Sequence, residues 1–137
     1  MSTWTHVAGV VRVDAIRIGT IAEPNWDDIF GKECACEESP SVWHDLDEHP
    51  EKYMPCGSEG SLQKVVWVNP KKNCVAAYTV CIFGDLRDWY DVNAIIEWFK
   101  KIVTNDDLLW VRSAVITVTN GIESKTWEYN FGEESEV

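Results

Sequence analysis

The hydrophobic pattern of the first half of the chain predicts three strands. Residues 4–18 are rich in β-branched side chains and contain no proline, which is typical of a strand buried on at least one face. Residues 61–68 and 74–83 have the same character. The segment between them, Asn69-Pro-Lys-Lys-Asn73, contains residues that favour a chain reversal. We therefore expect these two strands to pair as a hairpin.

A helix and a second hairpin are predicted in the second half. Asp91 can cap a helix whose apolar residues recur at three- and four-residue steps as far as Val103. Residues 108–119 are again β-rich, Asn120-Gly121 is a strong two-residue hairpin signal, and residues 124–131 alternate polar with aromatic side chains. Trp110 and Trp127 fall in these two strands, so we expect them to meet across the hairpin.

Residues 23–59 form an excursion of different character. Four of the five prolines lie here, the apolar periodicity is poor, and eleven Asp and Glu residues stand against two Lys. The run 132–137 adds a short acidic tail. We interpret residues 1–137 as one domain with an acidic insertion at 23–59.

The order of elements predicts an α+β domain with an antiparallel sheet of about five strands and one main helix. Two plans are open. If residues 25–30 form a short helix, the order approximates the β-α-β-β-α-β ferredoxin-like plan with an added edge strand. Otherwise, the fold is an antiparallel sheet covered on one face by one helix.

Composition narrows the class of protein. The chain has 137 residues, 45% of them hydrophobic, and no run of about 18 apolar residues that could span a bilayer. Residues 2–6 are polar, so we expect a cytosolic protein without a membrane partner. A formal net charge of −11 argues against direct binding of nucleic acid through phosphates and favours basic partners. Five cysteines without a secretory signal favour free thiols or a metal site over disulfides.

Three stretches carry a resemblance to known proteins: Ser2-Thr-Trp-Thr-His-Val7, Met54-Pro-Cys-Gly-Ser-Glu-Gly-Ser-Leu62 and Ile82-Phe-Gly-Asp-Leu-Arg-Asp-Trp89. Together they resemble small uncharacterised proteins encoded by bacteriophages and prophages, mainly of Gram-positive bacteria. The resemblance implies a setting in the host cytosol. Small acidic phage proteins of this kind often inhibit host defence, and CRISPR inhibitors that present carboxylates in place of phosphates are one example.

The acidic insertion is the first candidate site. A row of carboxylates can occupy a Lys- and Arg-lined groove built for phosphate, and neighbouring aromatic side chains can anchor the complex. The candidate residues are Asp27, Asp28, Glu33, Glu37, Glu38, Asp45, Asp47, Glu48 and Glu51, with Trp26, Trp43 and Tyr53 as anchors. The alternative is a solvated face that keeps the protein soluble.

Thiols and imidazoles in the same insertion are a candidate zinc site. The group consists of Cys34, Cys36, His44, His49 and Cys56. Zinc would hold together a segment with few apolar residues. However, Cys-x-Cys is tighter than the usual ligand spacing, so unliganded side chains are the alternative.

A glycine-rich loop is the third candidate. The loop contains Gly57, Ser58, Gly60 and Ser61, and its backbone amides could bind an anion such as a nucleotide phosphate. Arg87 could contribute a positive charge to the same ligand. The loop lacks the lysine and following helix of a P-loop. The alternatives are a bare turn and, for Arg87, a local ion pair with Asp85 or Asp88 in the connection to the helix.

These observations favour a binding protein over an enzyme. The three histidines have no catalytic spacing, and no motif of a known reaction is present. We expect a phage-encoded inhibitor that blocks a basic nucleic-acid-handling effector, such as a CRISPR nuclease, without a cofactor. The alternatives are a protein that sequesters a nucleotide signal and a virion assembly protein. The chain has eight tryptophans, and we expect Trp98 to lie at the flank of the helix. An apolar surface patch at that flank would suit self-association or a protein partner.

Overall fold

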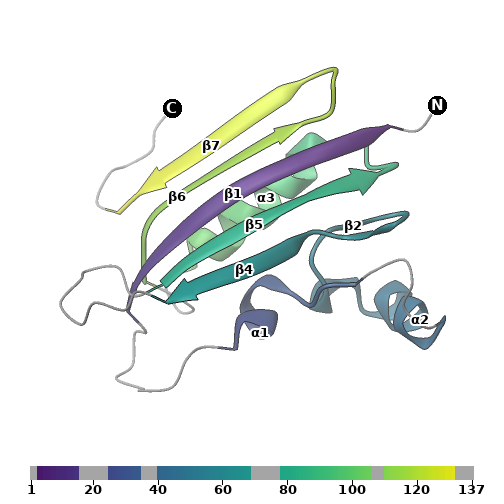
Figure 1. The fold of residues 1–137 in the computed structure, drawn as a ribbon, viewed down its shortest axis with the longest axis horizontal. Helices are drawn as coiled ribbons and strands as arrows, with labels where there is room; N and C mark the ends of the chain where they lie inside the picture. Colours follow the sequence, from purple (N-terminus) through teal and green to yellow (C-terminus); the bar gives the residue numbers. More distant parts are fainter. Residues whose placement is uncertain (1–2, 16–24, 35–39, 69–77, 106–109, 132–137) are drawn as a thin grey trace.

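The computed structural model describes residues 3–15, 25–34, 40–68, 78–105 and 110–131 (Figure 1). Its elements are, in chain order, β1 (Trp4–Ala15), α1 (Trp26–Phe30), α2 (Pro40–Glu48), the 3-10 helix η1 (Pro50–Lys52), β2 (Cys56–Gly57), β3 (Gly60–Ser61), β4 (Gln63–Val68), β5 (Tyr78–Arg87), α3 (Val92–Val103), β6 (Trp110–Thr119) and β7 (Ser124–Asn130). No helix in these ranges is long and apolar enough to cross a membrane.

Five strands form the main sheet in the order β4-β5-β1-β6-β7, and β2 and β3 form a separate small hairpin. All four pairs of neighbouring strands in the main sheet are antiparallel. The predicted α+β class and the hairpin of the second and third predicted strands are therefore confirmed. In the ferredoxin-like plan each β-α-β unit is split by a strand that lies between its two parallel strands, so neighbouring strands are antiparallel there as well. The order β4-β5-β1-β6, the short helix α1 between β1 and β4, and β7 as an added edge strand match this first plan.

Alternation along the strands decides which face of the sheet is buried. In β1 the odd-numbered residues from Thr5 to Val13 point inward, and Val11 and Val13 have no exposed surface. Helix α3 covers this inner face (Figure 1). The core also contains Phe30, Met54 and Leu62 from the region between β1 and β4. Part of the excursion thus belongs to the hydrophobic core.

Helix α3 matches its sequence pattern closely. The side chain of Asp91 accepts a hydrogen bond from the backbone amide of Ala94 at 3.1 Å, which caps the first turn. Val92, Ile95, Phe99 and Val103 are buried, at the spacing of one helical face. The predicted cap and apolar face of the helix are confirmed.

The short helix in the excursion is also present. Asn25 caps α1 by accepting hydrogen bonds from the amides of Asp27 and Asp28. Gly31, with φ of 103°, ends the helix, and a Cβ atom there would lie 2.6 Å from the backbone nitrogen of Met54. Glycine is therefore required at this position both by its backbone angle and by the close approach of the chain.

Two local expectations are wrong. Gly84, Asp85 and Arg87 belong to β5 and not to a connection, since β5 pairs with β1 as far as Trp4. Trp110 and Trp127 do not meet, because the β6–β7 hairpin pairs Thr119 with Ser124 and therefore places Trp127 opposite Ile116. Trp110 instead pairs with Ala15 of β1. The Asn120-Gly121 hairpin itself is confirmed, with a loop of residues 120–123.

Candidate functional site

The three stretches that carry the resemblance meet at one end of the main sheet. The start of β1 pairs with the end of β5, with Trp4 opposite Arg87. The amide of Asp88 donates to the carbonyl of Thr3 at 2.6 Å. The buried hydroxyl of Thr5 donates to the carbonyl of Trp89 at 2.6 Å. The first and third stretches are thereby fixed to each other.

The β2–β3 hairpin brings in the second stretch by packing on the end of β5. The amide of Ser58 donates to the carbonyl of Arg87 at 2.9 Å, and its hydroxyl donates to the carboxylate of Asp88 at 2.8 Å. A Cβ atom on Gly57 would lie 2.6 Å from the Arg87 carbonyl oxygen, so a larger residue does not fit. Asp88 itself has φ of 60° and turns the chain out of β5.

The bond between Thr5 and Trp89 gives a direct test of this junction. Thr5→Val keeps the shape of the side chain but removes the donor, so we expect unfolding free energy to fall by about 1–3 kcal/mol. Thr126→Val is the matched control, because its hydroxyl contacts Thr117 on an exposed part of the sheet. Urea unfolding of both variants is the measurement. Equal losses in the two variants would contradict a special role for the buried bond.

Charged side chains lie on the outer side of the junction. His6 Nδ1 and Asp85 Oδ1 are 2.6 Å apart, and both side chains are more than half exposed. Arg87 contacts Glu59 at 3.2 Å, and its guanidinium lies 6.0 Å from the centre of the Trp4 ring. The expected ion pair of Arg87 is therefore made mainly with the hairpin, while Asp88 lies at 4.0 Å.

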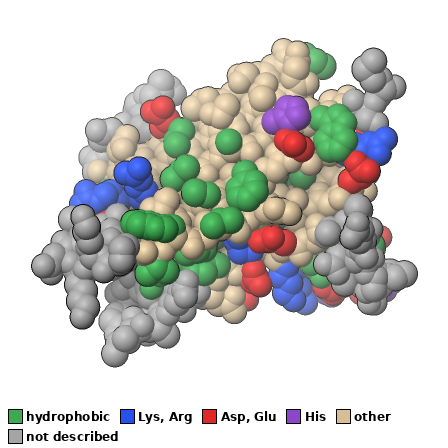
Figure 2. All heavy atoms as spheres, in the orientation of Figure 1, with side chains coloured by type: hydrophobic (Ala, Val, Ile, Leu, Met, Phe, Trp, Pro, Cys, Tyr) green, Lys and Arg blue, Asp and Glu red, His purple; other side chains and the backbone are tan. Residues whose placement is uncertain are grey.

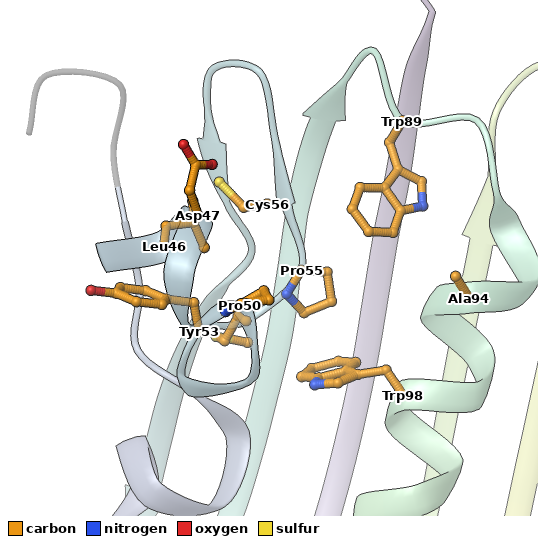
Figure 3. Close-up of a pocket in the computed structure, with 10 residues that line it drawn as sticks. Leu46, Asp47, Pro50, Tyr53, Pro55, Cys56, Trp89, Ala94 and Trp98 are labelled. Carbon is orange, nitrogen blue, oxygen red and sulfur yellow. The ribbon is translucent and has the colours of Figure 1, made fainter. Parts of the chain in front are cut away.

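A pocket of about 460 Å³ lies on the inner side, between the excursion and α3 (Figure 3). Trp89 and Trp98 form the side nearer α3, and Tyr53, Pro50 and Pro55 face them from the other side. The remaining lining residues are Leu46, Asp47, Met54, Cys56 and Ala94. We call this cavity the tryptophan pocket. Its volume and its apolar lining with few polar groups are typical of a binding site.

The wall of the tryptophan pocket is held by a hydrogen bond to α2. The hydroxyl of Tyr53 donates to Asp45 at 2.6 Å, and in Figure 3 it points away from the cavity. This bond, opposed in part by burial, lowers the pKa of Asp45 from its ordinary value. Asp45 therefore keeps its negative charge at neutral pH and fixes the Tyr53 ring.

The acidic residues of the excursion do not share one surface. Asp27 and Glu33 lie 2.6 and 3.9 Å from the ammonium of Lys64, whose side chain is only 6% exposed. These two carboxylates offset a buried positive charge within the protein. The exposed acidic residues of α1, α2 and η1 are Asp27, Asp28, Asp47, Glu48 and Glu51, and Glu33 is exposed as well. Glu37 and Glu38 lie outside the described residues.

The proposed aromatic anchors also differ from one another. Trp26 packs against the core, with its ring stacked on Phe30 at 6.3 Å and edge-on to Tyr78 at 5.3 Å. Trp43 is half-buried on α2. Tyr53 is buried and lines the tryptophan pocket. Trp26 thus has a clear structural role, whereas Tyr53 lies at a cavity.

The candidate metal ligands are only partly assembled. The thiols of Cys34 and Cys56 are within hydrogen-bonding contact, but His44 contacts Glu48 at 3.0 Å and His49 contacts Glu51 at 3.5 Å. Cys36 lies outside the described residues. Within the described ranges, no three His, Cys, Asp or Glu side chains gather as metal ligands do.

Burial of the thiol pair has a consequence at high pH. Desolvation, together with the neighbouring Cys34, raises the pKa of Cys56 from 9.0 to about 12. The unfolded chain loses this proton first, so the contribution of Cys56 to stability falls as pH rises from about 9 towards 12. We expect the difference in unfolding free energy between wild type and Cys56→Ala to shrink over this range in urea titrations. A constant difference would contradict a half-buried Cys56 thiol that stays protonated in this pH range.

The glycine-rich loop is used within the protein. Ser58 contacts the end of β5, as described above. The amide of Ser61 donates to the Cys34 carbonyl at 2.8 Å, and its hydroxyl accepts from the Cys34 amide at 2.8 Å. Arg87 faces Glu59 of the same loop. An anion at this loop would have to displace Glu59, so the contacts favour a structural role.

Comparison with known proteins identifies no family. No protein-family model matches the chain, and neither the curated proteins nor the solved structures include a significant match. The candidate site therefore depends on geometry. Sequence patterns place Trp98 at the flank of its helix but contain no local signal for the pocket, because its walls come from α2, η1, the hairpin and α3.

Proposed function

We propose that the protein is a non-enzymatic inhibitor that binds a basic, nucleic-acid-handling effector of a host defence system, with a CRISPR nuclease as the partner class. The observation that carries this proposal is the position of Asp47. It lines the tryptophan pocket and belongs to α2, which also exposes Glu48, followed by Glu51 in η1. Negative charge and an aromatic cavity therefore lie next to each other.

This arrangement suits a Lys or Arg side chain of the partner. The cationic group would lie beside Asp47, and its aliphatic part would pack on Trp98 or Trp89. The exposed carboxylates of Glu48 and Glu51 would increase the rate of encounter with a basic groove. The aromatic walls would slow dissociation, as anchors at interface centres do.

Charge reversal at the pocket tests the proposal. We expect Asp47→Lys/Glu48→Lys to weaken binding to guide-loaded CRISPR nucleases by at least about tenfold, since like charges then face each other. Binding and inhibition of DNA cleavage would be measured across a salt series, in which the wild-type complex should weaken as salt rises. Glu123→Lys in the β6–β7 loop makes the same change in net charge as the single variant Asp47→Lys and is the control for it.

A second substitution tests the aromatic wall of the tryptophan pocket. Trp98→Ala removes one wall of the pocket, and Trp110→Ala, at an exposed position of β6, is the matched control. Faster dissociation in Trp98→Ala alone would support the anchor. Unchanged binding in both pocket variants, or binding that is insensitive to salt, would contradict the proposed mode of inhibition.

Sequestration of a nucleotide signal has less support. The loop and Arg87, which this function would use, are occupied by contacts with β5, Cys34 and Glu59. A rise in melting temperature on addition of a nucleotide, without binding to any basic effector, would favour this alternative.

A further inference from the structure

The outer face of the main sheet carries a group of exposed apolar side chains. In the described part of the chain no helix covers this face, which Figure 2 shows towards the viewer. One row of side chains, Val65, Cys81, Val10 and Val115, crosses four neighbouring strands in register. The other apolar members are Trp4, Ala8, Trp67 and Phe83. We call these eight residues the open-face patch.

The exposure of the patch is high for large apolar side chains. Val65 is 55% exposed, Trp67 53% and Phe83 39%. Large exposed apolar side chains gathered on one face of a sheet are typical of an interaction site. Sheets bury such faces by packing against another sheet about 10 Å away.

Charge on the same face is balanced. Arg12, Arg87 and Arg112 stand against Asp14, Asp85 and Glu128 on the outward-facing positions of the described strands. Arg112 contacts Asp14 at 2.9 Å, and His6 contacts Asp85 at 2.6 Å. The chain as a whole carries a net charge of −11. Two copies can therefore pack through the open face without the charge repulsion that the acidic surfaces of the protein would cause.

The size of the face matches the need of a dimer. The five strands have 12, 6, 10, 10 and 7 residues, an average of nine. At about 4.8 Å between strands and about 3.3 Å per residue, the face measures roughly 25 by 30 Å, or about 750 Å². A standard stable interface buries about 800 Å² per partner. A single copy of the same sheet is therefore sufficient to cover the patch.

We propose that the open face is the interface of a two-fold symmetric homodimer. A two-fold axis in the plane of the interface and perpendicular to the strands lays the apolar half, β4-β5-β1, on the same half of the second copy. An axis between the Ala8 and Val10 rows also places Arg12 opposite the His6–Asp85 pair of the second copy. Among the described residues, none makes an ion pair with Arg12 inside one copy. Because the axis is two-fold, the contact between Arg12 and the His6–Asp85 pair occurs twice in the dimer.

The dimer leaves the tryptophan pocket accessible. The pocket contains Ala94 and Trp98 of α3, which lies on the opposite face of the sheet. The inference is therefore independent of the proposed function. Self-association and effector binding can be measured and can fail separately.

Sedimentation equilibrium of the full chain in reducing buffer tests the proposal. The expected mass at high concentration is twice that of the 15.6 kDa chain. Phe83→Lys and Val65→Lys should each raise the dimer dissociation constant at least about tenfold. Ile122→Lys, which makes the same change at a position 89% exposed in the β6–β7 loop, should leave it unchanged. A monomer at every concentration, or dimers that both patch variants retain, would overturn the proposal.

A charge swap tests the orientation of the two copies. Arg12→Asp should weaken the dimer, and Arg12→Asp/Asp85→Arg should restore it, because the swap recreates the same contact with the charges exchanged. Circular dichroism would confirm that all variants are folded. A folded double variant that remains monomeric would overturn the stated arrangement.

Discussion

Phe99→Ala is expected to lower the free energy of unfolding by about 3–5 kcal/mol. Phe99 has no exposed surface and lies on the buried face of α3. Its ring contacts Trp127 of β7 edge-on, with centroids 5.9 Å apart, and also approaches Trp98 at 6.4 Å. The substitution therefore removes both the burial of a large side chain and an aromatic contact between the helix and the sheet.

Lys100→Ala is the control for this variant, because Lys100 is the next residue of α3 and is exposed. Its effect should stay within about 0.5 kcal/mol. Both variants would be compared by urea unfolding followed by tryptophan fluorescence. A loss below about 1 kcal/mol in Phe99→Ala would contradict the packing of α3 on the sheet.

Gly57→Ala is expected to lower the free energy of unfolding by about 2–3 kcal/mol and to displace the β2–β3 hairpin. The added Cβ atom would lie 2.6 Å from the carbonyl oxygen and 2.7 Å from the nitrogen of Arg87. Both are backbone atoms of a strand, so they cannot move aside as a flexible side chain would. The hairpin must shift instead, and the Ser58 amide should lose its bond to the Arg87 carbonyl.

Gly121→Ala separates steric conflict from the general cost of replacing glycine. Gly121 has φ of 84° but nothing within 4 Å of the added Cβ atom, so its loss should be about 1 kcal/mol. Urea unfolding would give the two losses, and hydrogen exchange of the Ser58 amide would report on the hairpin. Equal losses with unchanged exchange would show that the hairpin does not pack on β5 as described.

The three stretches at residues 2–7, 54–62 and 82–89 meet at one end of the main sheet and share a structural role there. Thr5, Ser58 and Trp89 are far apart in the sequence, yet their hydrogen bonds fasten the start of β1, the hairpin and the end of β5 together. The tryptophan pocket lies directly behind this junction. A variant that loosens the hairpin should therefore also disturb the pocket, which links Gly57 to the proposed binding site.

Several features of the fold follow from the sequence alone because they depend on neighbours within a few residues. The caps at Asn25 and Asp91 act on amides two or three positions away. The buried face of α3 follows from the spacing of Val92, Ile95 and Phe99. Alternating β-branched residues and the Asn120-Gly121 signal likewise locate the strands and a hairpin.

Other features depend on contacts between distant segments, and no local pattern reports them. Asp27 and Glu33 are exposed, as expected, but no local pattern shows that the fold of the excursion brings Lys64 beside them. Trp26 meets Tyr78 for the same reason. The register of β6 and β7 separates Trp110 from Trp127, although their positions along the chain suggested a contact.

The sequence by itself therefore determined the five strands of the main sheet, the helices at 26–30 and 92–103, their order and the strong negative charge. It did not predict α2, η1 or the β2–β3 hairpin. Tertiary structure decided which charges are neutralised, which aromatic rings line a cavity and which face of the sheet stays open. The physical reason is the range of the interactions. Periodicity and capping act along the chain, whereas strand order, the buried Lys64 and the tryptophan pocket arise from pairings across tens of residues.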